Sequence, residues 1–488
     1  MNSVTRFLLL ACACTLPGLA TGVAPSPVQF RPDLATLAQV PRYEPAAAAV
    51  QDALARAERP ERPRRFAVPI ALNLPLAQGR WQALADGSAG WRLRLRSPGA
   101  RSLSAHLAAL QLPTGAQLWI YGARGEVVYG PYTAANITAS GFWTPVVPAD
   151  ELVLELHAPA SAISGVRLEV AEAFHGYEEL GKAGGAGTSG SCNVDAACEA
   201  ATWDAEARSV ALITVANQFY CSGQLVNNVQ QDQAPLFLTA RHCGINRERG
   251  TADSVNFYFN YDAACGQPAP PQPSATVTGS TFLADDQTSD FTLLRLNGAP
   301  PTNAYFAGWN ATGQGSPSGA SLHHPSGDAK KISLYSSPTA LASVSIGGAC
   351  NVEAWEVHWD SGTTEGGSSG GGLWSAAHQL IGVLSGGTAS CANPGGGDFF
   401  GRLDRAWTAS PSRDGQLKAH LDPNSTCIAA VPGLDPSVTP NAAPVTSGPQ
   451  RCESPATECS AGGGGGPVPG SLSAVLLTAL LIRRRRAA

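Results

Sequence analysis

The amino-acid sequence predicts an all-β protein made of two globular regions joined by a flexible linker. Short apolar segments alternate with turns rich in Gly, Pro and Asn along most of the chain, as strands and their connections do. The chain of 488 residues is about three times as long as one domain usually is. Apart from two near the start, all cysteines follow residue 191, just after a Gly- and Ala-rich stretch at 182–190. A cysteine-free β-rich region therefore precedes a cysteine-containing one.

Composition excludes several classes of protein. Charged residues make up 14% of the chain, and the formal net charge is -5. The basic residues are scattered apart from Arg483–Arg486, so no basic stripe indicates binding to nucleic acid. No uninterrupted apolar run reaches the length of about 18 residues that is typical of a membrane span, which argues against a protein with several spans.

The first residues predict export. Arg6 precedes the apolar run Phe7–Ala13 and small residues follow, so we expect residues 1–22 to be a signal peptide. A pro-region is then expected at 23–182, with an irregular or partly helical lead-in up to Arg65.

Alternation of side chains predicts the strands of the first region, about 66–178. In Trp91–Arg96 apolar and basic residues alternate strictly, and Leu152–Leu156 has a leucine at every second position, as half-buried strands do. Leu118–Tyr121 and Val127–Tyr129 flank the turn Gly122–Gly125, which predicts a hairpin. We therefore expect a small β-sandwich.

The second region, from Cys192 to Leu434, predicts a sandwich or a pair of barrels. Strand-like apolar segments recur in it between turns: Leu236–Leu238, Phe257–Phe259, Phe291–Leu296 and Leu380–Leu384. Residues 435–461 are rich in Pro, Thr, Ser and Gly, and we interpret them as a linker.

Residues 462–488 resemble a bacterial Gly-Gly type of C-terminal sorting tag. Glycines, a short apolar stretch and the arginine cluster follow one another there. The resemblance implies transient anchoring in a membrane through this tail and its later removal. A low-complexity tail is the alternative.

Ten cysteines remain once Cys12 and Cys14, in the signal peptide, are set aside. An even number in an exported chain favours disulfides over zinc ligands or a reactive thiol, and the sequence has no CxxC motif. We therefore expect an oxidising compartment and no structural metal site.

Three segments carry candidate catalytic residues. His242 follows the apolar run Leu238–Ala240, Asp290 precedes Phe291–Leu294, and Ser369 lies in a glycine-rich segment bounded by apolar residues. Taken singly, a structural histidine, a strand cap and a linker are the more ordinary interpretations. Together they occur in the order His, Asp, Ser, separated by 48 and 79 residues, and predict acyl-transfer chemistry.

With these segments in place, the region from Cys192 to about Asp435 resembles the trypsin-like serine peptidases, and most closely the bacterial lysyl endopeptidases. Further motifs carry the resemblance: Ser189–Asn193, Leu225–Asn228, His323-His324-Pro325 and Gly367–Gly370. It implies a chymotrypsin-like double β-barrel peptidase domain at 183–434, preceded by a β-sandwich-like pro-domain. It also implies a monomer when mature, with no metal or organic cofactor. An alternative metal site at His323 and His324 is disfavoured, because adjacent side chains on a strand point to opposite sides.

The resemblance assigns roles residue by residue. His242 would be the general base, Asp290 its orienting carboxylate and Ser369 the nucleophile. The backbone N–H groups of Gly367 and Ser369 would form the oxyanion hole. Asp398 would lie at the floor of the S1 pocket and bind a basic P1 side chain, a surface turn being the alternative. The position six residues before the nucleophile, acidic in trypsin, is Thr363 here.

The sequence departs from the family at two places. Ser385 stands before Gly386 and Gly387 of the substrate cleft, where the lysyl endopeptidases have a histidine, and no tryptophan is evident at the stacking position. Ser368 stands where vertebrate trypsins have an aspartate that pairs with the new N-terminus. We therefore expect activation by removal of the pro-region, which would act as inhibitor and folding aid.

Lysine is rare in the chain. Of the 32 basic residues only four are lysines, namely Lys182, Lys330, Lys331 and Lys418. Resistance to self-digestion explains this as well as a codon preference for arginine does. Lys182 lies in the linker, so we predict self-maturation there and a mature enzyme that starts at Ala183.

The resemblance implies three disulfides: Cys192–Cys391, Cys198–Cys265 and Cys221–Cys243. Cys350 would be left to pair with Cys427, and Cys452 with Cys459.

The sequence therefore predicts a secreted or surface-sorted serine endopeptidase that cleaves proteins or peptides after lysine. Cleavage after arginine, or after both residues, is the nearest alternative. A catalytically silent surface protein that uses the same cleft for binding is the alternative from another class.

Overall fold

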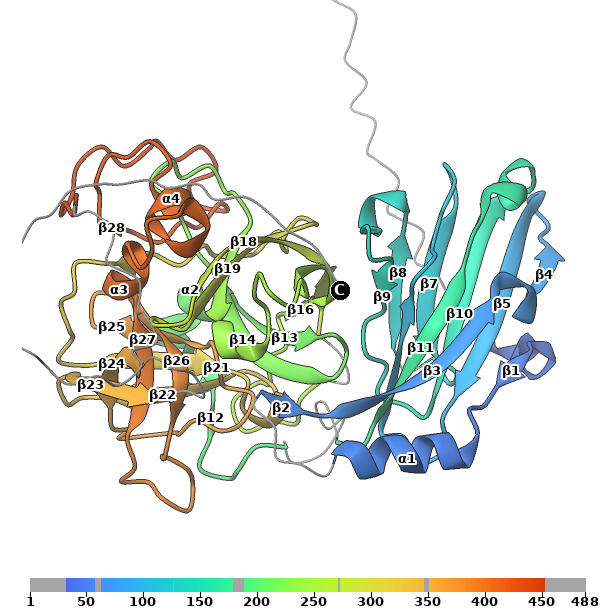
Figure 1. Ribbon diagram of the computed structural model, residues 1–488, viewed down its shortest axis with the longest axis horizontal. Coiled ribbons are helices and arrows are strands. Elements are labelled where there is room, and N and C mark those ends of the chain that lie inside the picture. Colours follow the sequence, from blue (N-terminus) through green and yellow to red (C-terminus); the bar gives the residue numbers. More distant parts are fainter. Residues whose placement is uncertain are drawn as a thin grey trace, which may run out of the picture.

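The computed structural model describes residues 32–57, 63–125, 127–178, 188–270, 273–345 and 351–452. The predicted signal peptide, the maturation site Lys182 and the C-terminal tail lie outside these residues. Two β-rich units stand side by side, and strand β2 reaches from the first unit into the second (Figure 1). The all-β fold class predicted from the sequence is confirmed. No helix in the described part of the chain is both long and apolar enough to cross a membrane.

The first unit is a sandwich of two sheets. The larger sheet has the strand order β1-β5-β10-β7-β8 with β4 on β5, and the smaller has the order β3-β11-β6-β9. Their bounds are β1 Arg42–Tyr43, β3 Ala67–Pro75, β4 Arg80–Ala83, β5 Ser88–Arg96, β6 Ser102–Leu107, β7 Gln117–Gly122, β8 Val128–Tyr132, β9 Phe142–Trp143, β10 Glu151–Pro159 and β11 Glu169–Gly176. The predicted hairpin is present, since Ile120 of β7 is opposite Tyr129 of β8.

Alternation along β5 and β10 produces the sandwich core. Trp91, Leu93 and Leu95 are buried between the sheets together with leucines of β10. Val153 on the opposite face of β10 is also fully buried, because the 3-10 turn Leu34–Gln39 packs Leu37 over it. The lead-in thus covers the outer face of the larger sheet and continues into helix α1 (Ala47–Ala57).

The second unit contains two larger sheets. One has the order β17-β16-β13-β14-β15-β19-β18, and the other has the order β12-β22-β21-β25-β26-β27-β24-β23 with β20 and β28 attached. The first sheet comprises β13 Val210–Val215, β14 Phe219–Leu225, β15 Leu236–Ala240, β16 Asn256–Phe259, β17 Ala275–Thr278, β18 Ser280–Asp286 and β19 Phe291–Leu296. The second comprises β12 Val194–Asp195, β20 Trp309–Asn310, β21 Gly319–His323, β22 Lys331–Tyr335, β23 Ala340–Ser345, β24 Asn351–Val357, β25 Gly372–Ser375, β26 Leu380–Gly387, β27 Asp398–Arg402 and β28 Ala430–Val431.

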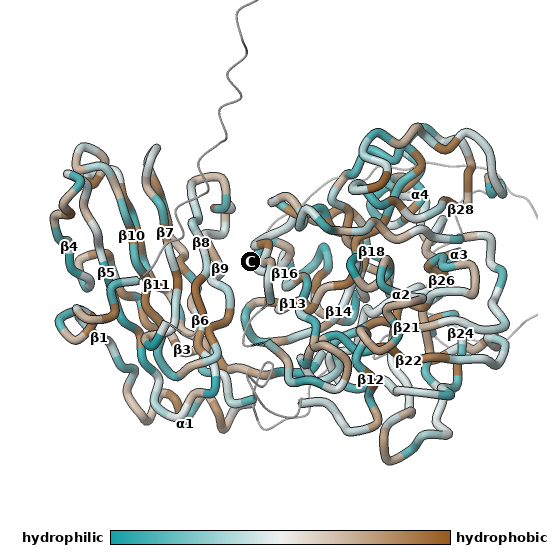
Figure 2. The backbone as a smooth tube through the Cα atoms, turned by 180° about the vertical axis from the view of Figure 1, so that it is seen from behind, coloured by the Kyte–Doolittle hydropathy of each residue, from teal (hydrophilic) through white to brown (hydrophobic). Residues whose placement is uncertain are grey.

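A shared core joins these two sheets. Leu238 and Phe291 from the first sheet pack with Trp309 and Trp374 from the second, and all four are buried. Hydrophobic stretches lie along strands of both units, including β6 and β21 (Figure 2). Helices are few and short: α2 Ala200–Ala207, α3 Leu403–Trp407 and α4 Lys418–Leu421. The cleft between the two sheets is therefore walled by strands and their loops.

The two units share an apolar interface. Strand β2 (Arg64–Arg65) pairs antiparallel with β14, and Phe66 N–H donates to the carbonyl of Gln218 at 2.8 Å. Phe66 packs in one cluster with Tyr220 and Tyr258 of the second unit. The first unit thus covers a tyrosine-rich face of the second.

Part of the predicted linker, 435–461, is folded instead. Val445 N–H donates to the carbonyl of Val229 at 2.8 Å, and Ala429 N–H donates to that of Pro449 at 2.8 Å. These bonds hold the chain against the second unit as far as Cys452, where Pro-rich composition alone indicated a loose connection.

Candidate active site

His242 and Asp290 lie at adjoining ends of two paired strands. Strand β15 ends at Ala240, and the following 3-10 turn, Arg241–Cys243, carries His242. Asp290 directly precedes β19, whose first residue, Phe291, is opposite Ala240 in the antiparallel register. The pairing of β15 with β19 therefore brings together two side chains that are 48 residues apart in the sequence.

The Asp290 carboxylate holds both the ring and the backbone of His242. Its Oδ2 lies 2.8 Å from Nδ1 of His242, and its Oδ1 accepts a hydrogen bond from the His242 N–H at 2.9 Å. Only 3% of Asp290 is exposed, so water is excluded from most of this contact. A carboxylate at Nδ1 keeps the ring proton on that nitrogen and leaves Nε2 able to accept another.

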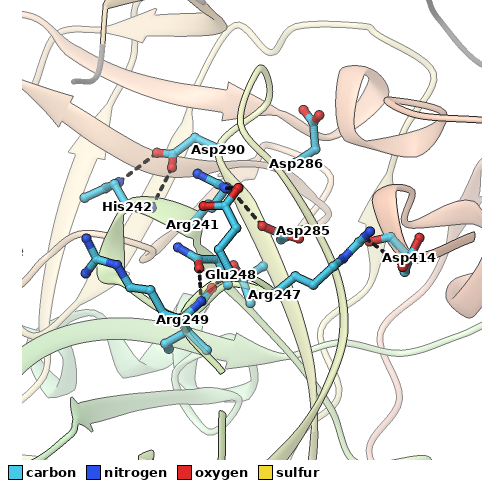
Figure 3. A network of polar contacts seen from close by, with 12 residues as sticks. Arg241, His242, Arg247, Glu248, Arg249, Asp285, Asp286, Asp290 and Asp414 are labelled. Atoms are coloured by element: carbon cyan, nitrogen blue, oxygen red, sulfur yellow. Dashed lines mark hydrogen bonds and ion pairs between the residues drawn. The ribbon is translucent and has the colours of Figure 1, made fainter. Parts of the chain in front are cut away.

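Arg241 fixes the same turn from its other side (Figure 3). Its Nε donates to Asp285 at 2.6 Å, its Nη2 lies 3.2 Å from Glu248, and its backbone N–H donates to the carbonyl of Asp290 at 3.0 Å. Burial raises the pKa of the Asp285 carboxyl, and the hydrogen bond from Arg241 opposes that rise. His242 therefore sits on a turn that is anchored before it by Arg241 and after it by the disulfide of Cys243.

Ser369 lies in a tight loop that Ser222 of β14 holds in place. The Ser222 N–H donates to the carbonyl of Ser369 at 2.8 Å, and its hydroxyl donates to that of Gly367 at 2.9 Å. Gly370 has φ of +81°, and a Cβ there would lie 2.3 Å from Oγ1 of Thr239, so the loop approaches β15 closely. The structure places Ser369 in the same cleft as His242.

Two backbone N–H groups of this loop have no hydrogen-bond partner in the part of the chain that the structure describes. The carbonyl of Gly366 accepts from Ser326 N–H at 2.7 Å, and that of Ser368 accepts from Gly371 N–H at 2.9 Å. Since the C=O and N–H of a trans peptide point in opposite directions, the N–H groups of Gly367 and Ser369 point away from these partners. Neither N–H has a hydrogen-bond partner among the described residues. Such a pair can bind an oxyanion.

A buried histidine lies behind the same loop. Glu365 N–H donates to Oγ of Ser368 at 3.0 Å, and this hydroxyl lies 2.8 Å from Nδ1 of His323. Nε2 of His323 lies 3.1 Å from Oγ of Ser333, which donates to a backbone carbonyl at 2.9 Å. Burial and the charge of Lys331 lower the pKa of His323 to about 3. A neutral His323 thus accepts a hydrogen bond from Ser368 at Nδ1 and donates one to Ser333 from Nε2.

The cleft that contains His242 and Ser369 has a volume of about 490 Å³. It is lined by Pro63, Arg64, His242, Ser326, Thr364, Glu365, Gly366, Gly367, Ser369, Leu384, Ser385, Gly386, Gly387, Ala389 and Ser390. Two of these residues, Pro63 and Arg64, come from the first unit. The predicted cleft residues 385–387 belong to β26 and line this cleft together with Ser369.

Asp398 begins β27 and is fully buried beside this cleft. Its Oδ2 accepts from Trp359 Nε1 at 2.6 Å and from Thr364 Oγ1 at 2.7 Å, and its Oδ1 accepts from Ala389 N–H at 3.3 Å. Burial raises the pKa of the Asp398 carboxyl, and the hydrogen bonds from Trp359 and Thr364 oppose that rise. Gly387 is opposite Asp398 in the β26–β27 pairing, and a Cβ there would lie 1.8 Å from Oδ1. Only a residue without a side chain can therefore stand at position 387 while Oδ1 lies this close to β26.

Thr363 and Ser385 occupy buried positions. Both are 1% exposed, and neither hydroxyl has a hydrogen-bond partner among the described residues. Of Asp398, Thr363 and Ser385, only Asp398 therefore carries a charge.

The structure contains four disulfides in the described residues. Three are the pairs that the family resemblance implies: Cys192–Cys391, Cys198–Cys265 and Cys221–Cys243. The fourth joins Cys427 to Cys452. The predicted pairings of Cys427 with Cys350 and of Cys452 with Cys459 were therefore wrong, because the folded segment 435–452 returns Cys452 to Cys427. Cys350 and Cys459 lie outside the described residues.

Sequence reasoning missed the residues that support this site. Ser222 and Ser326 hold the loop of Ser369, and Trp359 and Thr364 hold Asp398. They contribute hydroxyl, indole or backbone N–H groups from distant segments, which leaves no local pattern in the sequence. The one available signal was the cluster of polar residues around Thr364, directly before the Gly-Ser motif.

Comparison with known sequences shows relatives over most of the chain. A family model described as the lysyl endopeptidase C-terminal domain matches residues 186–401, and one described as the lysyl endopeptidase N-terminal domain matches residues 41–176. A lysyl endopeptidase of Pseudomonas aeruginosa is 31% identical over 377 residues, which cover 72% of this chain and 80% of that protein.

Solved structures give weaker likenesses. The active form of the Rv3671c protease from M. tuberculosis is 17% identical with a TM-score of 0.33, over 46% of this chain and 88% of that one. The HtrA-type protease AlgW with a tripeptide is 16% identical with a TM-score of 0.29, over 41% of this chain and 58% of that one. On the family models and the curated relative, the chain belongs to the lysyl endopeptidase family of trypsin-like serine endopeptidases.

Proposed function

We propose that this chain is a secreted endopeptidase, made as a pro-enzyme, that cleaves peptide bonds after lysine through His242, Asp290 and Ser369. The observation that carries the proposal is the 2.8 Å contact between Asp290 and Nδ1 of His242 in the cleft that also contains Ser369. Four disulfides in the described residues support an oxidising compartment.

In the proposed reaction, Oγ of Ser369 attacks the carbonyl carbon of the substrate while its proton moves to Nε2 of His242. Asp290 stabilises the imidazolium that forms. The substrate oxygen becomes negative and accepts hydrogen bonds from the N–H groups of Gly367 and Ser369. Loss of one such donor typically costs about 2.7–4 kcal/mol in the transition state.

The intermediate collapses as the bond to the amine breaks, and His242 transfers its proton to that leaving amine. An acyl-enzyme on Ser369 remains. Water then loses a proton to His242 and attacks the ester carbonyl, which releases the acid product and restores the serine hydroxyl.

Asp398 supplies the proposed selectivity for a basic P1 residue. It is a fully buried carboxylate beside the cleft, and one of its oxygens lies against Gly387, which lines the cleft. A buried carboxylate that lacks a positive partner is costly, and an incoming ammonium would relieve that cost. Thr363, the alternative position for the acid, carries no charge.

The pro-region is proposed to inhibit the enzyme by lying across the cleft. Strand β2 extends β14 at the cleft margin, where Arg65 is opposite Phe219 and Arg64 is opposite Tyr220. Cδ of Arg64 lies 2.9 Å from the point where a Cβ of Gly366 would be. A substrate could not use this edge while β2 is paired with it.

The segment after the linker supports cleavage upstream of Thr188. Ser189 Oγ donates to Asp328 at 2.7 Å, Gly190 N–H donates to Glu365 at 2.8 Å, and the Cys192 disulfide follows. These contacts bind residues 189–192 to the rest of the second unit. Maturation after Lys182 stays a prediction.

Paired peptides that differ only in Lys or Arg at P1 test the proposal, with Ser369→Ala as the control. Strong preference for lysine that disappears in Ser369→Ala supports it. No cleavage of either peptide by the matured wild type overturns it, and equal cleavage of both withdraws lysine selectivity.

A further inference from the structure

The two oxygens of the Asp398 carboxylate are unequally available to a ligand. Oδ2 accepts two short hydrogen bonds, from Trp359 and Thr364, whereas Oδ1 accepts one long one from a backbone N–H at 3.3 Å. A carboxylate oxygen offers about two acceptor positions. Oδ2 is therefore saturated, and the remaining position is on Oδ1.

Asp398 is fully buried, and its Oδ1 lies against Gly387, a residue that lines the cleft. Oδ1 is the atom that lies 1.8 Å from where a Cβ of Gly387 would be, and Gly387 lines the cleft. The Trp359 ring packs against two other aromatic rings: its centroid lies 6.0 Å from that of Phe400 and 6.2 Å from that of Tyr335. The indole N–H therefore cannot swing away to release Oδ2 without disturbing this aromatic cluster.

Lysine and arginine need different geometry from a carboxylate. A guanidinium presents two parallel N–H groups that bind both oxygens at once, whereas an ammonium is a compact charge that can bind a single oxygen. A carboxylate with one oxygen already hydrogen-bonded can still bind an ammonium. It can make only one of the two hydrogen bonds that a guanidinium would form with a free carboxylate.

We infer that Trp359 and Thr364 are specificity-determining residues, which select lysine over arginine by occupying Oδ2 of Asp398. The inference rests on the proposed function, in which Asp398 binds the P1 side chain. It adds that the discrimination comes from the donors to Asp398 and not from the charge of Asp398 alone.

Thr364→Ala tests the inference, because it removes one donor to Oδ2 and opens space beside it. We expect the ratio of kcat/KM for arginyl over lysyl substrates to rise about tenfold, which corresponds to about one hydrogen bond. Thr364→Ser restores the hydroxyl and should restore the wild-type ratio. Trp359→Phe removes the other donor while keeping an aromatic ring, and should shift the ratio in the same direction.

Thr363→Ala is the matched control, since Thr363 is the adjacent buried threonine and its hydroxyl has no partner among the described residues. Its ratio should equal that of the wild type. An arginine-to-lysine ratio within about twofold of wild type in both Thr364→Ala and Trp359→Phe, measured on active folded enzyme, would overturn the inference.

The P1 preference of the wild-type enzyme distinguishes failure of this inference from failure of the proposed role of Asp398. Equal cleavage after both basic residues overturns the inference but leaves Asp398 as a general binder of basic side chains. Absence of any basic preference, unchanged in Asp398→Asn, overturns the assignment of Asp398 and with it the inference.

Discussion

Ser368 and His323 form a 2.8 Å hydrogen bond next to Ser369, the proposed nucleophile, and both residues are fully buried. Since Ser368 also accepts from Glu365 N–H, loss of its hydroxyl leaves the buried Nδ1 of His323 and the partly buried N–H of Glu365 unpaired. We expect Ser368→Ala to lower kcat about tenfold with KM and lysine preference unchanged, because the loop would hold Ser369 less firmly. Steady-state kinetics on a lysyl ester measures this.

Ser321 provides the control for Ser368. It is equally buried on β21, and its hydroxyl has no partner among the described residues. Ser321→Ala should keep kcat. If Ser368→Ala lowers stability while kcat per titrated active site stays at the wild-type value, the hydrogen bond is structural only.

Acidification should weaken the binding of basic side chains. Burial raises the pKa of Asp398, so its carboxylate takes up a proton at a higher pH than an exposed aspartate does. Affinity is complete above that pKa and is lost as pH falls through it. We expect the Kd of a lysyl peptide for Ser369→Ala to rise on acidification before the pH reaches the reference value of about 3.9.

Calorimetric titration of Ser369→Ala at several pH values measures this change. In Ser369→Ala combined with Asp398→Asn, the affinity should be low throughout and nearly independent of pH. The same pH dependence in both proteins would assign the titration to another group.

Removal of two disulfides should have similar effects on stability but different effects on catalysis. Cys221–Cys243 closes a loop of 22 residues next to His242, and Cys427–Cys452 closes one of 25 residues at the end of the described chain. Loop entropy predicts that replacing either pair by serines lowers the free energy of unfolding by about 3 kcal/mol. Only the first replacement should also lower kcat, because only Cys243 follows the histidine. Urea unfolding together with kinetics of the two double variants checks this, and equal loss of kcat in both would refute it.

The uncleaved chain should be nearly inactive until β2 is released. We use Lys182→Gln as the background, which is expected to keep the chain in one piece. Phe66 is 1% exposed and anchors β2 against Tyr220 and Tyr258. Phe66→Ala should raise the activity of this uncleaved protein on a small lysyl ester at least about tenfold, since burial of such a ring is worth roughly 3–5 kcal/mol.

Arg80→Ala is the control for this effect, because Arg80 is exposed on strand β4 at the far side of the first unit (Figure 1). Its activity should stay at the background level. Uncleaved Lys182→Gln that is already fully active, with its intact mass verified, would rule out inhibition by β2.

Periodicity predicted much of the fold, and its failures have identifiable causes. The strict alternation in Trp91–Arg96 and the apolar runs at Leu236–Leu238 and Phe291–Leu296 correspond to observed strands. The alternation in Leu152–Leu156 predicts that Val153 lies on the exposed face of its strand. Val153 is instead fully buried, because the lead-in folds over that face. A cover formed by a distant irregular segment leaves no trace in the strand itself.

The candidate catalytic residues could be predicted from sequence motifs, because each of them would act through its own side chain. The residues that hold the site in place are distant in the sequence. Thr364 and Trp359 bind Asp398 from 34 and 39 residues away, and Arg64 enters the cleft from the first unit. Such contacts depend on three-dimensional packing. They could not be inferred from composition or spacing.

Under the proposed lysine selectivity, the positions of the remaining lysines limit how fast copies of the mature protein cleave one another. Lys330 and Lys331 are 1% and 9% exposed, and Lys418 begins helix α4. The bonds that follow them cannot enter a cleft as extended chain until the surrounding structure opens. Self-destruction of the mature form is therefore limited by opening of the fold, so the decay of activity in a concentrated stock reports the free energy of that opening.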